Sequence, residues 1–233
     1  MSTYLLANIG TRDVQLDSYD DLPPELVNPK SGMLIPRRAG AYFRQPEQFS
    51  RWLPHLRLPM IEKALRLIAP KPDASLRIIL FATDQPESVK EFYRDSDTIF
   101  FAELIRAVLI ERYTQIGLPK KQIEIRLTDS NPGDYDQMHD FYKKSLPGVA
   151  DRKPVPNPVY LLIAGGTPQM NTMLLLIGTE IFGPGAQPLY VSQELDRALN
   201  LDTTRLLYRQ ALQRNLDVIL KAYAYSSALK LLD

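Results

Sequence analysis

The residues with the clearest chemical potential lie in the stretch Leu161 to Met173 (LLIAGGTPQMNTM), where an apolar run ends at two adjacent glycines. Gly165 and Gly166 carry no Cβ, so a ligand or a neighbouring backbone can approach them closely. Thr167 is suited to cap a helix that starts at Pro168, because proline is favoured at the first helical position. The sequence therefore predicts a buried strand, a tight turn and a new helix at this point.

A helix start of this kind leaves backbone N–H groups without intrahelical acceptors and adds a partial positive charge. The N–H groups of Gln169, Met170 and Asn171 are then expected to be free to bind an anion such as a phosphate. The alternative is a turn in which glycine serves packing alone. We expect the Met170 side chain in the core, because Met170 begins an apolar helix stripe.

A second candidate segment follows the first apolar run of the chain and reads Asn8-Ile9-Gly10-Thr11-Arg12-Asp13. Its glycine permits close approach, its arginine offers a forked pair of donors to a phosphodiester, and its asparagine and threonine can hydrogen-bond a sugar or a base. The alternative for Arg12 is an ion pair with Asp13 or Asp17. The segment lacks the GxGxxG spacing of dinucleotide-binding folds, which argues against an NAD enzyme.

Two further polar segments follow apolar runs. After one of them come Thr83, Asp84 and Gln85. Asp84 and Gln85 can read the edges of bases, or Thr83 and Asp84 can cap the next helix. For the segment from Thr128 to Gly133 we expect a turn, because its residues are those that favour turns.

These segments are positioned by continuous apolar runs, which are typical of strands buried on both faces, and by helix-like segments between them. The alternation predicts an α/β, Rossmann-like fold with a mostly parallel sheet and helices on both faces. Because ligands of such sheets bind at the carboxyl ends of the strands, the polar segments are expected to meet at one edge. The expected strands are Thr3 to Asn8, Leu76 to Ala82, Ile123 to Leu127, Val159 to Ala164 and Leu189 to Ser192, and the expected helices are Met60 to Ile68, Ile99 to Ile116, Asp134 to Lys144 and Pro168 to Phe182.

The composition excludes several classes of protein. With 233 residues, 45% of them hydrophobic, and a formal net charge of +1, the chain is typical of a globular protein and lacks the charge of one that coats duplex DNA. It has no cysteine and two histidines, which excludes disulfides and cysteine nucleophiles and argues against a metal site. No apolar stretch has the length of a membrane span, and Met1 to Thr3 lead straight into a strand-like run instead of the basic region and apolar core expected of a signal sequence. We therefore expect a cytoplasmic protein without a cofactor.

We expect a single domain over residues 1–233 with two unusual regions. Residues 30–66 contain eight basic residues against two acidic ones, and a proline-rich stretch from Asp20 to Gln48 overlaps them. This basic excursion is either a lid that carries a local anion site or a solvated loop. Residues 203–232 are expected to form a C-terminal helical segment that packs on the sheet or on a second subunit.

Taken together, Asn8 to Asp13, Thr83 to Gln85 and above all Ala164 to Asn171 resemble the CARF family, the CRISPR-associated Rossmann-fold sensor domains of type III CRISPR systems. The resemblance implies an antiviral-defence protein that binds a cyclic oligoadenylate across a homodimer interface and thereby controls an effector domain, which would lie outside this chain. A ring of identical nucleotides suits a two-fold dimer, because each protomer supplies half of the site. A ring of four units is favoured as the commoner case in the family, and a ring of six is the alternative.

The resemblance also implies which residues contact the ring. An alternative within the family is a stand-alone ring nuclease, in which the 2′-hydroxyl of the ligand attacks the adjacent phosphorus without a metal, and Asn8, Thr11 and Arg12 would then be catalytic. Outside the family, the alternatives are a Rossmann-type nucleotide-binding enzyme and a ligand-sensing transcription regulator. The implied ligand-binding residues are Asn8, Ile9, Gly10, Thr11, Arg12, Thr83, Asp84, Gln85, Gly165, Gly166, Thr167, Pro168, Gln169, Met170 and Asn171.

Overall fold

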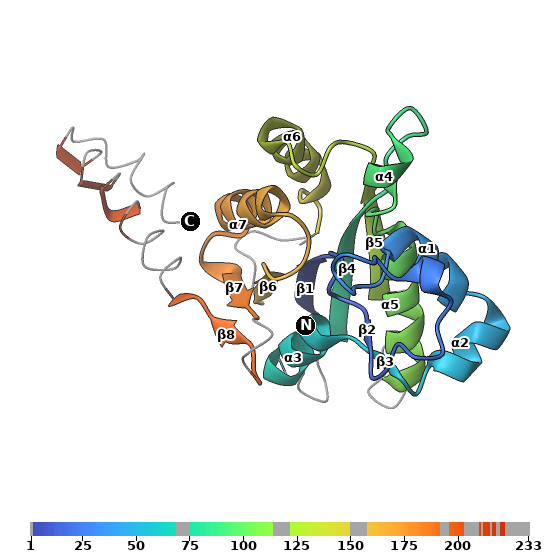
Figure 1. Cartoon of the computed structure of the whole chain (residues 1–233). Coiled ribbons are helices and arrows are strands. Elements are labelled where there is room, and N and C mark those ends of the chain that lie inside the picture. The colour runs from blue at the N-terminus through green and yellow to red at the C-terminus, as the bar shows by residue number, and fades with distance from the viewer. Residues whose placement is uncertain are drawn as a thin grey trace.

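The computed structural model describes residues 2–68, 75–113, 122–149, 158–191 and 196–202, together with the short pieces 210, 212–214, 216–217 and 220–221. Within these ranges a six-stranded sheet has the order β5-β4-β1-β6-β7-β8 (Figure 1). Neighbouring strands are parallel except for β8, which runs antiparallel to β7. This confirms the predicted mostly parallel sheet. The strands are β1 (Ser2–Asn8), β4 (Ser75–Thr83), β5 (Ile123–Thr128), β6 (Val159–Leu162), β7 (Ala186–Tyr190) and β8 (Leu199–Asn200).

Helices cover both faces of the sheet, as predicted. Alternate residues of each central strand point to opposite faces, so that Leu5 and Ala7 of β1 join one core while Tyr4 and Leu6 join the other. The first core is completed by α1 (Pro36–Phe43), α2 (Pro46–Trp52), α3 (Pro59–Ile68) and α5 (Ile99–Arg112), and the second by α6 (Tyr135–Ser145) and α7 (Pro168–Phe182). None of the helices in the described ranges is long and apolar enough to cross a membrane.

The proline-rich excursion is an ordered part of the fold. The helices α1, α2 and α3 begin at Pro36, Pro46 and Pro59. Proline suits a first helical position because its φ is already helical and its missing N–H would have had no partner there. The proline-rich stretch also contains the short helix η1 (Pro24–Leu26), and β3 (Leu56–Arg57) pairs antiparallel with β2 (Gln15–Leu16), which precedes the excursion.

The largest differences from the predicted boundaries are in β6, which ends at Leu162 instead of Ala164, in β7 and in α5. The strand β7 begins at Ala186, three residues earlier than expected, and includes Pro188, a residue that by itself argues against a strand. The helix α5 ends at Arg112, and the predicted end at Ile116 lies outside the described residues. Most of the predicted helical segment 203–232 also lies outside them, although the described pieces 212–214 and 216–217 are helical. The remaining elements are α4 (Glu91–Arg94) and η4 (Gly183–Gly185).

The topology creates a switch point beside the first strand. From β1 the chain adds β4 and β5 on one side, and it then returns to place β6 and β7 on the other side of β1. The loops that leave β1 and β6 therefore lead to opposite sides of β1, and their place at the carboxyl ends of the strands is the usual ligand-binding position of such sheets. These are the loops that contain Gly10 and Gly166.

Candidate functional site

The loops after β1 and β6 pack against each other backbone to backbone. A methyl group on Gly10 would overlap the backbone nitrogen of Gly166 and lie 3.2 Å from its Cα, and one on Gly165 would overlap the carbonyl oxygen of Asn8 and the carboxylate of Asp13. Gly166 has a positive φ of 72°. Close packing thus requires the glycines at positions 10 and 165, while backbone conformation favours the glycine at position 166.

The helix α7 begins as predicted, with Thr167 as its N-cap and Pro168 at its first position. The Thr167 hydroxyl accepts a hydrogen bond from the Met170 N–H at 3.2 Å and donates one to the carbonyl oxygen of Pro132. The Asn171 N–H donates to the Thr167 carbonyl oxygen at 3.0 Å. Of the three N–H groups expected to be free, only that of Gln169 therefore lacks an acceptor among the described residues. The cap and the first helical bond satisfy the other two.

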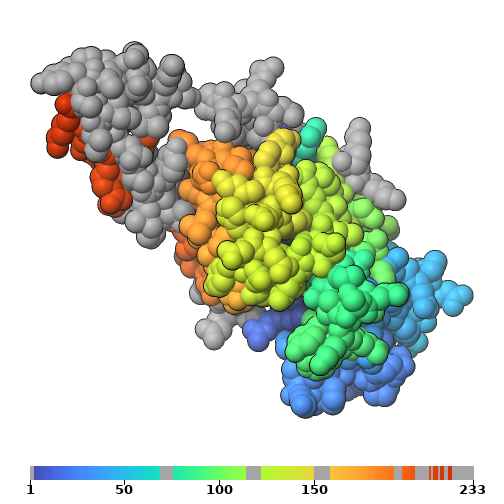
Figure 2. Space-filling view, turned by 90° about the horizontal axis from the view of Figure 1, so that it is seen from above, coloured from blue at the N-terminus to red at the C-terminus, as the bar shows by residue number. Residues whose placement is uncertain are grey.

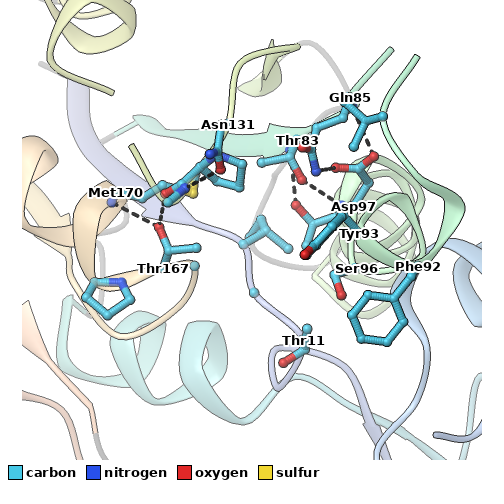
Figure 3. A pocket seen from close by; sticks show the side chains of 18 residues that line it. Thr11, Thr83, Gln85, Phe92, Tyr93, Ser96, Asp97, Asn131, Thr167 and Met170 are labelled. Carbon is cyan, nitrogen blue, oxygen red and sulfur yellow. Dashed lines mark hydrogen bonds between the residues drawn. The ribbon is translucent and has the colours of Figure 1, made fainter. Parts of the chain in front are cut away.

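A cavity of about 760 Å³ opens at the tips of the strands (Figure 3). Met170 belongs to the core, as expected, and its side chain also forms part of the cavity floor. The implied ligand-binding residues therefore divide into two groups. Those that line the cavity are Ile9, Gly10, Thr11, Thr83, Gln85, Gly166, Thr167, Pro168 and Met170, and those that do not are Asn8, Arg12, Asp84, Gly165, Gln169 and Asn171.

Asn8 lies behind the cavity rather than in its wall. Its side chain is 1% exposed, its amide nitrogen donates to the Asn171 side-chain oxygen at 2.9 Å, and its own side-chain oxygen accepts from the Tyr142 hydroxyl at 2.6 Å. Burial raises the pKa of Tyr142 well above its usual value, so this hydroxyl stays a donor. The three side chains join β1, α6 and α7, and the ligand-binding role expected of Asn8 stays a prediction.

Arg12 has none of the ion pairs considered for it. Its side chain is exposed, and no carboxylate of the described residues pairs with it. Asp17 instead lies 2.5 Å from Arg57, and Asp13 turns inward, where its carboxylate accepts the Gly10 N–H at 2.7 Å. Burial raises the pKa of Asp13 to about 7, against the opposing effect of that hydrogen bond. Among the described residues, the Arg12 guanidinium is therefore an unpaired cation, on the loop whose Gly10 and Thr11 line the cavity.

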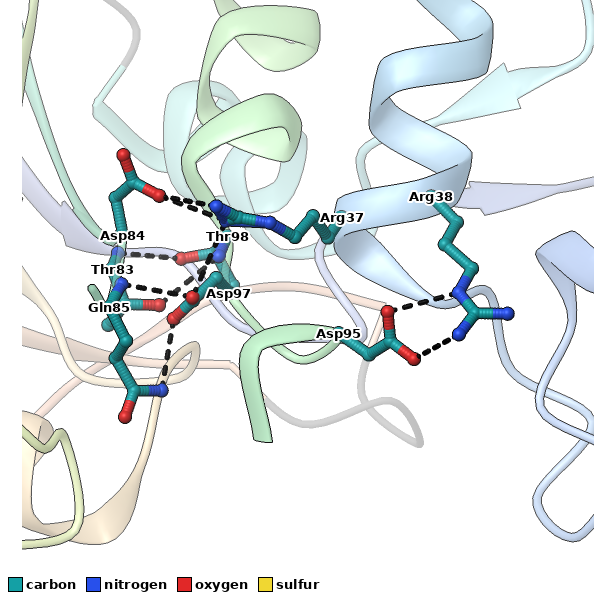
Figure 4. Close-up of polar contacts among 8 residues, drawn as sticks. All are labelled: Arg37, Arg38, Thr83, Asp84, Gln85, Asp95, Asp97 and Thr98. Carbon is teal, nitrogen blue, oxygen red and sulfur yellow. Dashed lines mark hydrogen bonds and ion pairs between the residues drawn. The ribbon is translucent and has the colours of Figure 1, made fainter. Parts of the chain in front are cut away.

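The polar residues at the end of β4 and just after it hold the cavity wall in place through hydrogen bonds (Figure 4). Thr83 and Thr98 exchange hydrogen bonds from backbone N–H to side-chain hydroxyl at 3.1 and 3.2 Å. The backbone N–H and the side-chain amide of Gln85 both donate to buried Asp97, at 3.0 and 3.1 Å. Thr83 and Asp84 therefore do not cap α4, although a cap of the next helix was one of the two predicted roles. Thr83 and Gln85 hold the junction between α4 and α5 against the end of β4.

The basic excursion carries less free charge than its composition suggests. Four of its six arginines pair with acidic residues of other segments, and no residue of 30–66 lines the cavity. The predicted local anion patch is therefore partly neutralised, because carboxylates far away in the sequence meet these guanidinium groups. The pairs are Arg37 with Asp84 at 2.7 Å, Arg38 with Asp95 at 2.6 Å, Arg44 with Glu103 at 2.7 Å and Arg57 with Asp17 at 2.5 Å.

Two walls of the cavity were not anticipated from the sequence. One is the predicted turn after β5, which the hydrogen bond from Gly133 N–H to the Asn131 side chain at 2.9 Å confirms as a turn. The other surrounds α4 and includes Phe92 and Tyr93. In the sequence, the feature that could have indicated this wall is the pair of adjacent aromatic residues, Phe92 and Tyr93, between polar ones. Across the described part of the chain, no cluster of three or more histidine, aspartate or glutamate residues is arranged to hold a metal ion.

Comparisons with known proteins agree with this architecture. No family model and no curated protein sequence matches the chain. Its fold is similar to that of Csm6 from Enterococcus italicus, solved bound to cyclic hexa-2′-fluoro-hexa-dAMP, with a TM-score of 0.56 and 16% sequence identity. The likeness covers 99% of this chain and 49% of the Csm6 chain, so this chain spans about half the length of that protein. At this identity the likeness shows a shared fold, the Rossmann-like α/β fold that the sequence predicts.

Proposed function

We propose that this chain is a CARF-type sensor domain of type III CRISPR antiviral defence, which binds a cyclic oligoadenylate in the cytoplasm and controls an effector domain. One observation carries the proposal. The CARF-like segments after β1, β4 and β6 come from separate parts of the sequence, yet each contributes residues to one cavity at the switch point of the sheet. The likeness of the fold to Csm6 with a bound cyclic adenylate analogue supports the same ligand class.

The donors around the cavity suit phosphate groups. The Gln169 N–H at the start of α7, the Thr11 hydroxyl and the exposed Arg12 guanidinium have no acceptor among the described residues. A helix start adds a partial positive charge to such donors. Since the Thr167 hydroxyl is already bonded to Pro132 and Met170, its role is to hold the helix start in place. We therefore assign phosphate binding to the backbone of this turn and to Arg12.

A two-fold homodimer completes the proposed site. Rings of four or six identical nucleotides have rotational symmetry, so that two copies of this cavity can bind opposite halves of one ring. Arg12, exposed beside the cavity loop, is suited to reach the phosphates between the two halves. A ring of four is the commoner case in the CARF family, whereas the ring bound to Csm6 is derived from six units.

Calorimetric titration with cyclic tetra-adenylate, cyclic hexa-adenylate and linear hexa-adenylate tests the proposal. We expect one cyclic ligand to bind with one ring per two chains. Arg12→Ala should weaken this binding about ten- to a hundredfold, because it removes charge-assisted hydrogen bonds. Arg57→Ala is the matched control, since Arg57 pairs with Asp17 and does not line the cavity.

If neither cyclic ligand binds the unmodified chain, the proposed function is wrong. Equal affinities of the Arg12→Ala variant and the unmodified chain would remove Arg12 from the site. Chromatography of the ligand after the titration also reports on cleavage. A ring recovered intact identifies a sensor alone, and a linear product with a 2′,3′-cyclic phosphate formed without metal identifies a ring nuclease.

A further inference from the structure

One wall of the cavity carries two aromatic side chains that the fold does not bury. Phe92 and Tyr93 of α4 are 77% and 57% exposed, and both line the cavity. Their rings pack edge to face with centroids 5.4 Å apart. Figure 3 shows Thr167 and Met170 at one end of the cavity and Gln85, Ser96 and Phe92 at the other. Large aromatic residues left at the surface beside a cavity are typical of a contact with another molecule.

The aromatic wall is held firmly in place from behind. Asp97, which is 0% exposed, accepts two hydrogen bonds from Gln85 and lies 3.5 Å from Arg37. At the end of α4, Asp95 pairs with Arg38 at 2.6 Å. In Figure 2 the segment around α4, in green, stands at the surface beside the blue excursion that contributes these arginines. A rigid wall of this kind loses little conformational entropy when a ligand binds.

Unpaired polar groups lie next to the aromatic rings. The side-chain oxygen of Gln85 and the hydroxyl of Ser96 have no hydrogen-bond partner among the described residues, and both residues line the cavity. Gln85 is only 9% exposed, and its unpaired side-chain oxygen remains accessible at the cavity, where it can accept a hydrogen bond from a ligand. Its amide nitrogen is bonded to Asp97, which orients the oxygen away from that carboxylate. The wall thus combines two exposed aromatic rings with a fixed acceptor beside them.

We infer that this wall is a base-binding subsite, in which one of the rings of Phe92 and Tyr93 stacks on an adenine base, the other packs against the edge of the base, and the Gln85 oxygen accepts a hydrogen bond from the exocyclic amino group of the base. Asp97 is a positioning residue, since it holds Gln85 and the α4 junction. The inference rests on the proposed function for the identity of the base. In a ring closed through its phosphates the bases are outward substituents, so that phosphates at the glycine loops place a base toward this wall.

Fluorescence of 2-aminopurine tests stacking directly, because stacking quenches this adenine analogue. The probe is cyclic hexa-adenylate or tetra-adenylate, whichever binds, with one adenine replaced by 2-aminopurine. We expect the unmodified chain to quench it. The double variant Phe92→Ala/Tyr93→Ala should bind the unlabelled ring about five- to a hundredfold more weakly and should lose the quenching.

Two controls separate stacking from other effects. Exchange of the two rings in Phe92→Tyr/Tyr93→Phe keeps both aromatic faces and should preserve quenching. Tyr190→Ala removes another exposed aromatic residue, one that does not line the cavity, and should change neither affinity nor quenching. In a ring of inosine nucleotides a carbonyl oxygen replaces the exocyclic amino donor of adenine. This ring should bind the unmodified chain about tenfold more weakly, because one hydrogen bond is lost.

The outcomes distinguish the inference from the proposed function. If the double alanine variant quenches the probe and binds the ring as the unmodified chain does, the inference is overturned. Ring binding by the unmodified chain would still support the sensor function in that case. If the unmodified chain binds no ring, adenosine monophosphate serves as the probe in ligand-observed NMR. Binding of this nucleotide that the double variant loses would support the subsite without the sensor function, and no such binding would overturn both.

Discussion

The buried carboxyl group of Asp13 gives the sharpest test of the structure. Asp13 is 3% exposed, and its carboxylate accepts a hydrogen bond from the Gly10 N–H at 2.7 Å. The same carboxylate lies so close to Gly165 that a methyl group added there would overlap it. No cation of the described residues pairs with it. The substitution Asp13→Asn keeps an oxygen acceptor for Gly10 but removes the charge. The variant should therefore differ from the unmodified chain in how its stability depends on pH.

The size of this pH effect on stability follows from the pKa of Asp13. Burial raises the pKa of Asp13 from 3.8 to about 7, so the folded chain holds this proton more tightly than the unfolded chain. Between these two values the folded state binds more protons, and the free energy of unfolding falls as the pH rises; above about pH 7 the effect is complete. At about 1.4 kcal/mol per pKa unit, the full penalty of ionised Asp13 is about 4 kcal/mol.

Urea unfolding of both chains at a series of pH values measures this penalty. The stability of Asp13→Asn relative to the unmodified chain should rise by about 3 kcal/mol from pH 4 to pH 7, while the other titrating groups cancel in the difference. Asp20→Asn, at an exposed aspartate, is the control and should show a flat difference. A flat difference for Asp13→Asn as well would refute the claim that its carboxyl group is buried without a compensating charge.

Two more substitutions test the loops and the buried polar contacts that support the cavity. Gly165→Ala places a methyl group on the Asn8 carbonyl oxygen and the Asp13 carboxylate, and should destabilise the fold by about 1–3 kcal/mol, seen as a Tm lowered by several degrees. In Gly133→Ala the new methyl group would meet only the Asn131 side chain at 3.3 Å, so this variant should lose clearly less stability. Equal losses of stability in the two variants would contradict the close packing of the loops after β1 and β6. Tyr142→Phe leaves the buried Asn8 oxygen without its donor and should lower the free energy of urea unfolding by about 1–3 kcal/mol. Tyr135→Phe, at a half-exposed tyrosine, should change it little, and a Tyr142→Phe variant of unchanged stability would show that the buried hydrogen bond is not formed.

Much of the fold was predictable because its causes are local. Continuous apolar runs mark the buried strands, and a proline preceded by a cap, as at Thr167 and Pro168, marks the start of a helix. The meeting of Gly10 and Gly166 was also predictable, since parallel strands place their carboxyl ends at one edge and the switch point lies beside the first strand. The early start of β7 was missed, because pairing with β6 outweighs the poor strand propensity of Pro188.

Tertiary structure alone decided which polar groups are free. From sequence, Asp13 and Asp17 are equal candidates for Arg12, yet Asp13 is buried against a loop and Asp17 binds Arg57. Likewise, Asn8 belongs to a buried contact with Tyr142, and Arg37 is neutralised by Asp84. Local propensities set the conformation of a segment through neighbours in the chain. The partner of a charge or an amide is set by whichever distant group packing brings within hydrogen-bond distance, and a sequence pattern carries no record of that distance.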